Sequence, residues 1–166
     1  MELTAINQAS PAEAREFFGK CCTSNAWVSR MVARRPFQST AVLRQIADES
    51  WTNLGEGDYL EAFQGHPKIG DINSLQSRYA ASKSMAANEQ SGVTEANRRL
   101  LELLDHGNRV YESRFGFIFI IFATGKTADQ LIKSLYARLQ NDRNTEVRIA
   151  AEEQRKIIHL RLDKML

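Results

Sequence analysis

The 166-residue sequence lacks the features that mark several classes of protein. Its two cysteines, Cys21 and Cys22, are neighbours in the chain, so they do not easily bridge each other and show no zinc-binding spacing. Two thiols without a disulfide framework are typical of a reducing compartment. The 22 lysines and arginines nearly balance 20 aspartates and glutamates and form no basic block, which argues against a nucleic-acid partner.

Long apolar runs are also missing. The longest run covers residues 117–123, whereas a membrane-spanning helix needs about twenty apolar residues, so we expect no membrane partner. The first residues lack a basic stretch followed by an apolar one, and we expect no secretory signal and a cytoplasmic location. Hydrophobic residues make up 43% and charged residues 25% of the chain, which predicts one globular domain over residues 1–166.

Only three prolines and nine glycines interrupt the chain, and the remaining pattern predicts an all-α fold. Ser10 followed by Pro11 predicts a helix start, with the helix running toward Gly19. Ser39 or Thr40 is expected to cap the next helix. Further helices are expected over residues 58–63 (capped by Asp58), 74–88, 95–114, 127–139 and 145–164.

The segment from Phe115 to Ala123 departs from this pattern. Its aromatic and β-branched residues favour a buried strand, but no second run of this quality is available to pair with it. An isolated extended segment leaves backbone N–H and C=O groups that need partners, which neighbouring helix ends or a ligand could supply. Simple core filling and a continued helix are equally compatible with its composition. We expect a helical bundle with one short extended apolar segment near 117–123.

Three side chains are candidates for chemistry. His66 stands between Gly65 and Pro67 on a predicted turn, and imidazole titrates near neutrality, which suits proton transfer. Glu89, near an expected helix end, could accept hydrogen bonds from N–H groups or set the charge of a nearby imidazole. Arg161 follows apolar helix positions and could reach a pocket to bind an anion or carbonyl.

The residues alone also allow a plainer interpretation of each candidate. His66 could be a loop histidine without a role, Glu89 a solvated acid, and Arg161 an arginine at the edge of the core or paired with an acid. His106 and His159 are weaker candidates, the latter because no acid partner is evident. The sequence contains neither a phosphate-binding loop nor a serine nucleophile elbow, and it is poor in metal ligands.

Five short segments together resemble one family. Gly65-His66-Pro67-Lys68-Ile69-Gly70 resembles the histidine–proline signature of 2-oxo-4-hydroxy-4-carboxy-5-ureidoimidazoline (OHCU) decarboxylase. The other segments follow the family's order across essentially the whole chain: Arg35-Pro36-Phe37, Glu89-Gln90-Ser91-Gly92, Phe115-Gly116-Phe117-Ile118-Phe119 and Ile157-Ile158-His159-Leu160-Arg161-Leu162. Each segment alone is a weak signal, and their shared order makes the resemblance specific.

The resemblance implies an all-α, homodimeric, cofactor-free decarboxylase that converts OHCU to (S)-allantoin in urate breakdown, with a small ureide as its substrate and no metal. It implies that His66, Glu89 and Arg161 are catalytic, with His66 as the proton donor. The substrate-binding residues it implies are Pro67, Ala86, Ala87, Asn88, Glu89, Gln90, Phe119, Ile120, Ile121, Phe122, Ala123 and Arg161.

Two positions depart from the family pattern. Ala86 stands where the family commonly has serine, which removes a hydroxyl contact, and Ile118 stands where it has proline, which restores a backbone N–H. These departures keep open a helical binding module without activity. The sequence is also compatible with a lyase or hydrolase that acts on another ureide, such as allantoin. A metal-dependent enzyme is disfavoured because so few metal ligands are present.

Overall fold

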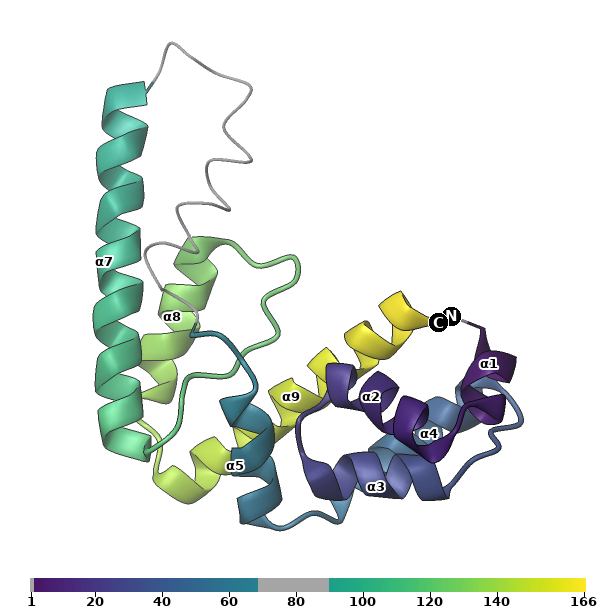
Figure 1. The fold of residues 1–166 in the computed structure, drawn as a ribbon. Helices are drawn as coiled ribbons and strands as arrows, with labels where there is room; N and C mark the ends of the chain where they lie inside the picture. The colour runs from purple at the N-terminus through teal and green to yellow at the C-terminus, as the bar shows by residue number, and fades with distance from the viewer. Residues whose placement is uncertain (1, 69–89) are drawn as a thin grey trace. The chain divides into compact units, whose positions relative to one another are not determined.

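A computed structural model describes residues 2–68 and 90–166, with side chains from residue 98 onward in the second range. These residues form helices and no strand, which confirms the all-α prediction (Figure 1). The helix expected over 74–88 lies outside the described residues. The helices are α1 (Leu3–Gln8), α2 (Pro11–Cys21), α3 (Asn25–Ala33), α4 (Thr40–Thr52), α5 (Glu56–Gln64), α7 (Gln90–Phe115), α8 (Ala128–Arg138) and α9 (Arg143–Met165).

Polar caps begin several of these helices as the sequence predicts. The Ser10 hydroxyl accepts from the Glu13 N–H, and the Glu13 carboxylate accepts from the Ser10 N–H, which forms a capping box at α2. Ser39 caps α4, and Thr127 caps α8. Such caps satisfy backbone N–H groups that have no partner within the helix and contribute about 1 kcal/mol each.

Other boundaries differ from the prediction. Helix α5 begins at Glu56 with Gly55 at the N-cap, and the Asp58 carboxylate reaches back to the Gly55 N–H at 3.1 Å, so Asp58 lies in the first turn rather than at the cap. Helix α7 begins at Gln90, five positions before the predicted start, and α2 continues past Gly19 to Cys21. Helices α1 and α3 were not predicted.

The described chain divides into two compact units. The first unit comprises Met1–His66 and Val147–Leu166. Its largest fully buried side chains are Ile6, Phe18, Trp27, Met31, Leu43, Phe63 and Ile158. Both tryptophans donate their indole N–H to helix carbonyls, Trp27 to Ala47 at 3.1 Å and Trp51 to Ala151 at 2.9 Å. The core of this unit is therefore tied by directional contacts as well as by apolar burial.

The second unit comprises Pro67–Glu146 and is built around α7 and α8. Gly107 of α7 faces Leu135 of α8, and a Cβ at Gly107 would collide with that leucine, so glycine permits the close approach of the two helices. Residues 116–127 form neither helix nor strand. This backbone conformation excludes a strand and a continued helix, and the burial of Phe117, Phe119 and Ile120 agrees with core filling.

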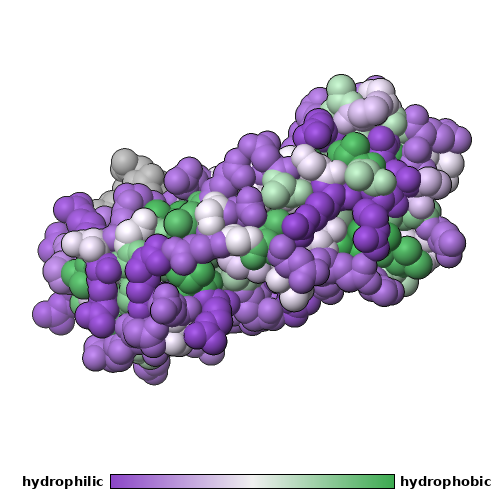
Figure 2. All heavy atoms as spheres, turned by 90° about the horizontal axis from the view of Figure 1, so that it is seen from below, coloured by the Kyte–Doolittle hydropathy of each residue, from purple (hydrophilic) through white to green (hydrophobic). Residues whose placement is uncertain are grey.

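Charged and polar residues dominate the visible surface. In the space-filling view, hydrophilic residues cover most of the displayed face, and hydrophobic residues appear as separate small patches (Figure 2). Among the described residues, no helix combines the length and the apolar composition that crossing a membrane requires.

Candidate functional site

His66 is placed by the end of α5. Its backbone N–H donates to the Phe63 carbonyl at 3.2 Å, just after the helix terminates at Gln64. The Thr23 hydroxyl donates to the Glu61 carbonyl at 3.1 Å, and a Cβ at Gly65 would collide with the Thr23 side chain. Gly65 is therefore required by close packing at this turn, which fixes the backbone next to the imidazole.

Two side chains of α9 contact the two imidazole nitrogens of His66. The Gln154 Oε1 lies 2.5 Å from Nε2, and the Arg161 Nη2 lies 3.3 Å from Nδ1. A guanidinium group has only donors, so Nδ1 must be the acceptor and carries no proton. The ring proton then resides on Nε2 and is donated to Gln154. The geometry therefore describes a neutral imidazole in one tautomer.

The electrostatics agree with a neutral ring. Burial lowers the pKa of His66 from its ordinary value of 6.5, and the nearby Arg161 charge lowers that pKa further. The hydrogen bond to Gln154 acts in the opposite direction and does not overcome the other two. Near pH 7 the imidazole of this structure is neutral, and its basic nitrogen, Nδ1, accepts a hydrogen bond from Arg161.

Arg161 is held by the first unit's own backbone. Its Nη1 donates to the Cys21 carbonyl at 3.0 Å, and Ile158 and Leu162 on either side of it along α9 are buried. Within the described part of the chain it forms no ion pair with a carboxylate. The structure thus favours an arginine aimed at His66 over an arginine paired with a described acid.

Gln154 is the site residue that the sequence prediction missed. It is 0% exposed and lies on the buried stripe of α9 formed by Val147, Ala150, Ala151, Ile158 and Leu162. An amide at an apolar position of a helix is the signal that could have revealed it. Its Nε2 is the one buried side-chain polar atom without a hydrogen-bond partner among the described residues.

In the 119–123 segment of the second unit, one backbone carbonyl accepts a hydrogen bond from a side chain. Arg138 of α8 donates from Nη1 to the Ile120 carbonyl at 2.7 Å, and its guanidinium lies 4.5 Å from the centre of the Phe119 ring. Arg138 is in turn bound to the buried Glu146 at 2.9 Å. We expected helix ends or a ligand to satisfy this backbone, and a buried arginine does so at Ile120.

The remaining predicted site residues differ in burial, and some lie outside the described residues. Pro67 is exposed directly after His66, and Gln90 is the first residue of α7. Phe119, Ile120 and Ile121 are buried, while Phe122 and Ala123 are partly exposed, all within the second unit. Ala86, Ala87, Asn88 and Glu89 lie outside the described residues.

The other two histidines are separate from this site. His159 was expected to lack an acid partner, but its Nε2 lies 2.7 Å from the Asp48 Oδ1, so that expectation was wrong. Asp48 also pairs with Arg155 at 3.0 Å, and the three residues form a partly exposed ion-pair cluster. His106 is exposed on α7. Among the described side chains, His66 alone is a histidine held between an arginine and a buried amide.

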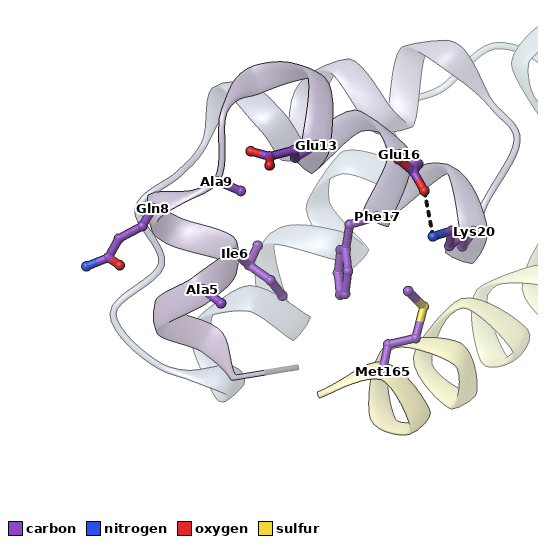
Figure 3. A pocket seen from close by; sticks show the side chains of 9 residues that line it. All are labelled: Ala5, Ile6, Gln8, Ala9, Glu13, Glu16, Phe17, Lys20 and Met165. Carbon is purple, nitrogen blue, oxygen red and sulfur yellow. Dashed lines mark hydrogen bonds and ion pairs between the residues drawn. The ribbon is translucent and has the colours of Figure 1, made fainter.

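A cavity of about 640 Å³ lies elsewhere in the first unit, between α1, α2 and the end of α9. Ile6, Phe17 and Met165 point toward one another across it (Figure 3). Its charged groups are already engaged, since Glu16 pairs with Lys20 at 2.8 Å and Glu13 belongs to the α2 capping box. This cavity therefore offers apolar volume, whereas the proton chemistry lies at His66.

No group of three or more histidine, cysteine, aspartate or glutamate side chains within residues 2–68 and 98–166 is arranged to hold a metal ion.

Cys21 and Cys22 are both free and buried, and burial raises the pKa of each thiol to about 12.

Comparison with known sequences gives consistent results. A model of the OHCU decarboxylase family matches residues 7–163. The uric acid degradation bifunctional protein TTL of Arabidopsis thaliana is 31% identical over 145 residues, which are 87% of this chain and 45% of that protein. The 2-oxo-4-hydroxy-4-carboxy-5-ureidoimidazoline decarboxylase of Haloferax volcanii is 24% identical, covering 98% of this chain and 94% of that protein. The chain thus spans less than half of the bifunctional relative.

Solved structures agree with the sequence matches. A crystal structure of OHCU decarboxylase in the presence of (S)-allantoin is 33% identical, with a TM-score of 0.72, and the match covers 90% of this chain and 96% of that one. A crystal structure of (S)-allantoin synthase is 18% identical, with a TM-score of 0.71 over 100% of this chain and 54% of that one, and supports the fold.

Proposed function

Because the chain belongs to the OHCU decarboxylase family, we propose that it converts OHCU to (S)-allantoin in urate catabolism without a cofactor. The observation that carries this proposal is the pairing of a neutral, partly buried His66 imidazole with the Arg161 guanidinium. A base and a fixed positive charge side by side suit a reaction that moves a proton while negative charge develops on the substrate.

The decarboxylation of OHCU requires few protein groups beyond His66 and Arg161. Loss of CO2 breaks the bond between the ring carbon and the carboxylate carbon, and the electron pair stays on the ring. The conjugated ring delocalises this pair, so the substrate itself is the electron sink. Replacing the carboxylate by hydrogen consumes one proton overall. Delivery of that proton to one face of the ring gives a single enantiomer.

We assign that delivery to His66 and the binding of developing oxyanion charge to Arg161. Removing one well-placed donor of this kind typically costs about 3 kcal/mol of transition-state stabilisation. Glu89 is proposed to hold the ureido N–H groups of the substrate and to favour the charged form of His66 during the reaction.

The remaining assignments follow the family resemblance. Pro67, Ala86, Ala87, Asn88, Gln90 and the 119–123 segment are proposed to line the substrate. At Ala86 the hydroxyl contact common in the family is missing unless Ser84 or a water molecule replaces it. The whole chain is proposed to work as one domain in a cytoplasmic homodimer.

The deciding experiment supplies freshly generated OHCU to the wild type, His66→Ala and His106→Ala, and follows substrate loss together with optical rotation. The wild type and the exposed-histidine control should produce (S)-allantoin at the same rate, and His66→Ala should be slower by about 1,000-fold. Equal rates for all three proteins would exclude His66 as the catalyst. A folded wild type that binds the ureide without turnover would instead identify a binding module.

Glu89 is tested separately, because its surroundings lie outside the described residues. Glu89→Ala should lower turnover, and Glu89→Gln should retain part of the substrate binding while losing the charge effect on His66. Unchanged turnover in Glu89→Ala would remove this residue from the site.

A further inference from the structure

Gln154 lies at the centre of the His66 site without a role in the reaction described above. We propose that Gln154 is a positioning residue that keeps the ring proton of His66 on Nε2 and leaves Nδ1, beside Arg161, as the nitrogen that exchanges protons with the substrate. The inference deepens the proposed function and rests on it, since it assumes that His66 performs the proton transfer.

The directions of the two hydrogen bonds determine which nitrogen of His66 carries the proton. Arg161 has no acceptor, so the 3.3 Å contact from its Nη2 requires an unprotonated Nδ1. The neutral ring must then carry its proton on Nε2, and Gln154 must present Oε1 to receive it at 2.5 Å. A reversed amide would set its NH2 group against the ring N–H. The three side chains therefore fix one another's orientation.

Gln154 is fully buried at an otherwise apolar position. Its side chain is 0% exposed, and Nε2 has no partner among the described residues. An unsatisfied buried donor costs roughly 1–3 kcal/mol, and an apolar side chain at the same position of the α9 stripe would avoid that cost. Stability of the unit therefore does not explain an amide here, whereas its contact with His66 does.

Exposure distinguishes the two nitrogens. Nε2 faces the fully buried Gln154, while Nδ1 faces Arg161, and both His66 and Arg161 are partly exposed. The described charged group acting on the ring is Arg161 of α9. At the end of α2, the thiols of Cys21 and Cys22 stay neutral near pH 7 because their pKa values are raised to about 12. Nδ1 is therefore the basic nitrogen, and it lies on the side of the partly exposed Arg161.

A coupling between the two catalytic groups follows. When Nδ1 takes a proton from the substrate, the ring becomes an imidazolium with donors on both nitrogens. Gln154 Oε1 still accepts from Nε2–H, but Arg161 can no longer donate to Nδ1 and its N–H becomes available to a substrate oxyanion. When the same proton passes from Nδ1 to the ring carbon after CO2 has left, His66 returns to the neutral tautomer, and the one proton that the reaction consumes overall is taken up from solvent by the anionic product.

The first test uses wild-type protein labelled with 15N-histidine and reads the imidazole nitrogen shifts by NMR near pH 7. There are three histidines, and the His66 signals are identified by their loss in His66→Ala. We expect a protonated Nε2 and an unprotonated Nδ1. A protonated Nδ1, or an averaged mixture of both tautomers, would overturn the proposal without any variant at position 154.

The second test compares Gln154→Leu, Gln154→Glu and the matched control Gln45→Leu, which makes the same change at an exposed position of α4. Gln154→Leu should give averaged nitrogen shifts and a kcat lower by about 10- to 100-fold, as for other partners that orient a catalytic histidine, with little change in KM. Gln154→Glu should restore the acceptor and move the histidine limb of the pH–rate profile upward by about one unit. Gln45→Leu should match the wild type.

The outcomes separate this inference from the function on which it rests. If His66→Ala keeps wild-type turnover, the proposed catalytic histidine fails, whichever tautomer the NMR spectra report. If His66→Ala is inactive but Gln154→Leu keeps the wild-type nitrogen shifts and kcat, only the positioning role fails.

Discussion

Each unit contains a polar cluster that includes an arginine, around Glu146 in the second unit and around His66 in the first, and the two clusters differ in how fully their polar groups are hydrogen-bonded. In the second unit, Glu146 is 0% exposed and accepts from Arg138, Tyr111 and Asn141. In the first unit, His66 contacts Arg161 and Gln154, and the Gln154 Nε2 has no described partner. The Glu146 cluster is saturated with hydrogen bonds, whereas the His66 cluster retains an unused donor at Gln154 and a basic nitrogen, Nδ1, that accepts from Arg161.

The difference separates a structural role from a chemical one. A buried ion pair whose oxygens are all satisfied has no group left for a ligand, and its effect is to hold the Ile120 carbonyl and the surrounding rings in place. A partly exposed, neutral imidazole beside a positive charge is costly to stabilise and able to exchange a proton. We therefore expect changes in the Glu146 cluster to reduce stability and changes around His66 to reduce activity.

The largest effect is expected in the Glu146 cluster. Arg138→Leu leaves the Glu146 charge buried without its partner, which should lower the free energy of unfolding by about 3–5 kcal/mol. Urea unfolding followed by far-ultraviolet circular dichroism measures this loss. The double variant Arg138→Leu/Glu146→Leu removes both charges and should recover part of the stability. A single variant as stable as the wild type would contradict the structural role.

The next effect concerns Arg161. Arg161→Met keeps the aliphatic stem but loses the charge, so kcat/KM should fall about 100-fold while the unfolding free energy changes by less than about 1 kcal/mol. The pKa of His66 should also rise, because the Arg161 charge lowers it. Arg155→Met, on the same helix, is the matched control in the turnover assay. Equal losses in both variants would argue against a specific role for Arg161.

A smaller effect is expected in the pH dependence of stability. The pKa of His66 is lowered in the folded protein, so the unfolded chain, with its ordinary value of 6.5, binds this proton first as the pH falls. The contribution of this group is complete above about pH 6.5 and decreases below it. Unfolding free energies at pH 7.5 and 5.5 should therefore differ more for the wild type than for His66→Ala. An identical pH dependence would show that the ring is not held neutral.

The smallest effect is expected at the Asp48 cluster. The Asp48 side chain is 37% exposed and pairs with His159 and Arg155 near water, where such pairs contribute about 0–1 kcal/mol. Asp48→Asn should therefore leave turnover unchanged and lower the melting temperature by only a few degrees. A large loss of activity would show that the His66 site is not the only functional histidine site.

Local signals explain which helices the sequence predicts. Ser10, Ser39 and Thr127 cap helices within three residues of their own position, so neighbouring residues are enough to locate these starts. Asp58 was misplaced because a carboxylate near a helix start suits both the cap and the first turn, and the extended backbone of Gly55 decides between them. Helix α1, with six residues, is too short for a periodic pattern.

Long-range contacts explain what the sequence could not show. His66 and Arg161 were identified as candidates from their residue types and the family resemblance, but their contact joins residues 95 positions apart. The partner of Gln154 is 88 positions away, and its immediate neighbours in the sequence are charged. Only the α9 stripe, in which Gln154 replaces an apolar residue, carries information about its burial.

The labelling rate of the two adjacent thiols, Cys21 and Cys22, measures how often the first unit opens locally. Both are fully buried with pKa values of about 12, so alkylating reagents cannot reach a thiolate in the closed protein. The Cys21 carbonyl also holds Arg161, so a fluctuation that frees this stretch of backbone releases the guanidinium as well. The rate of thiol labelling therefore reports how often the arginine loses its anchor, on a timescale that turnover assays do not sample.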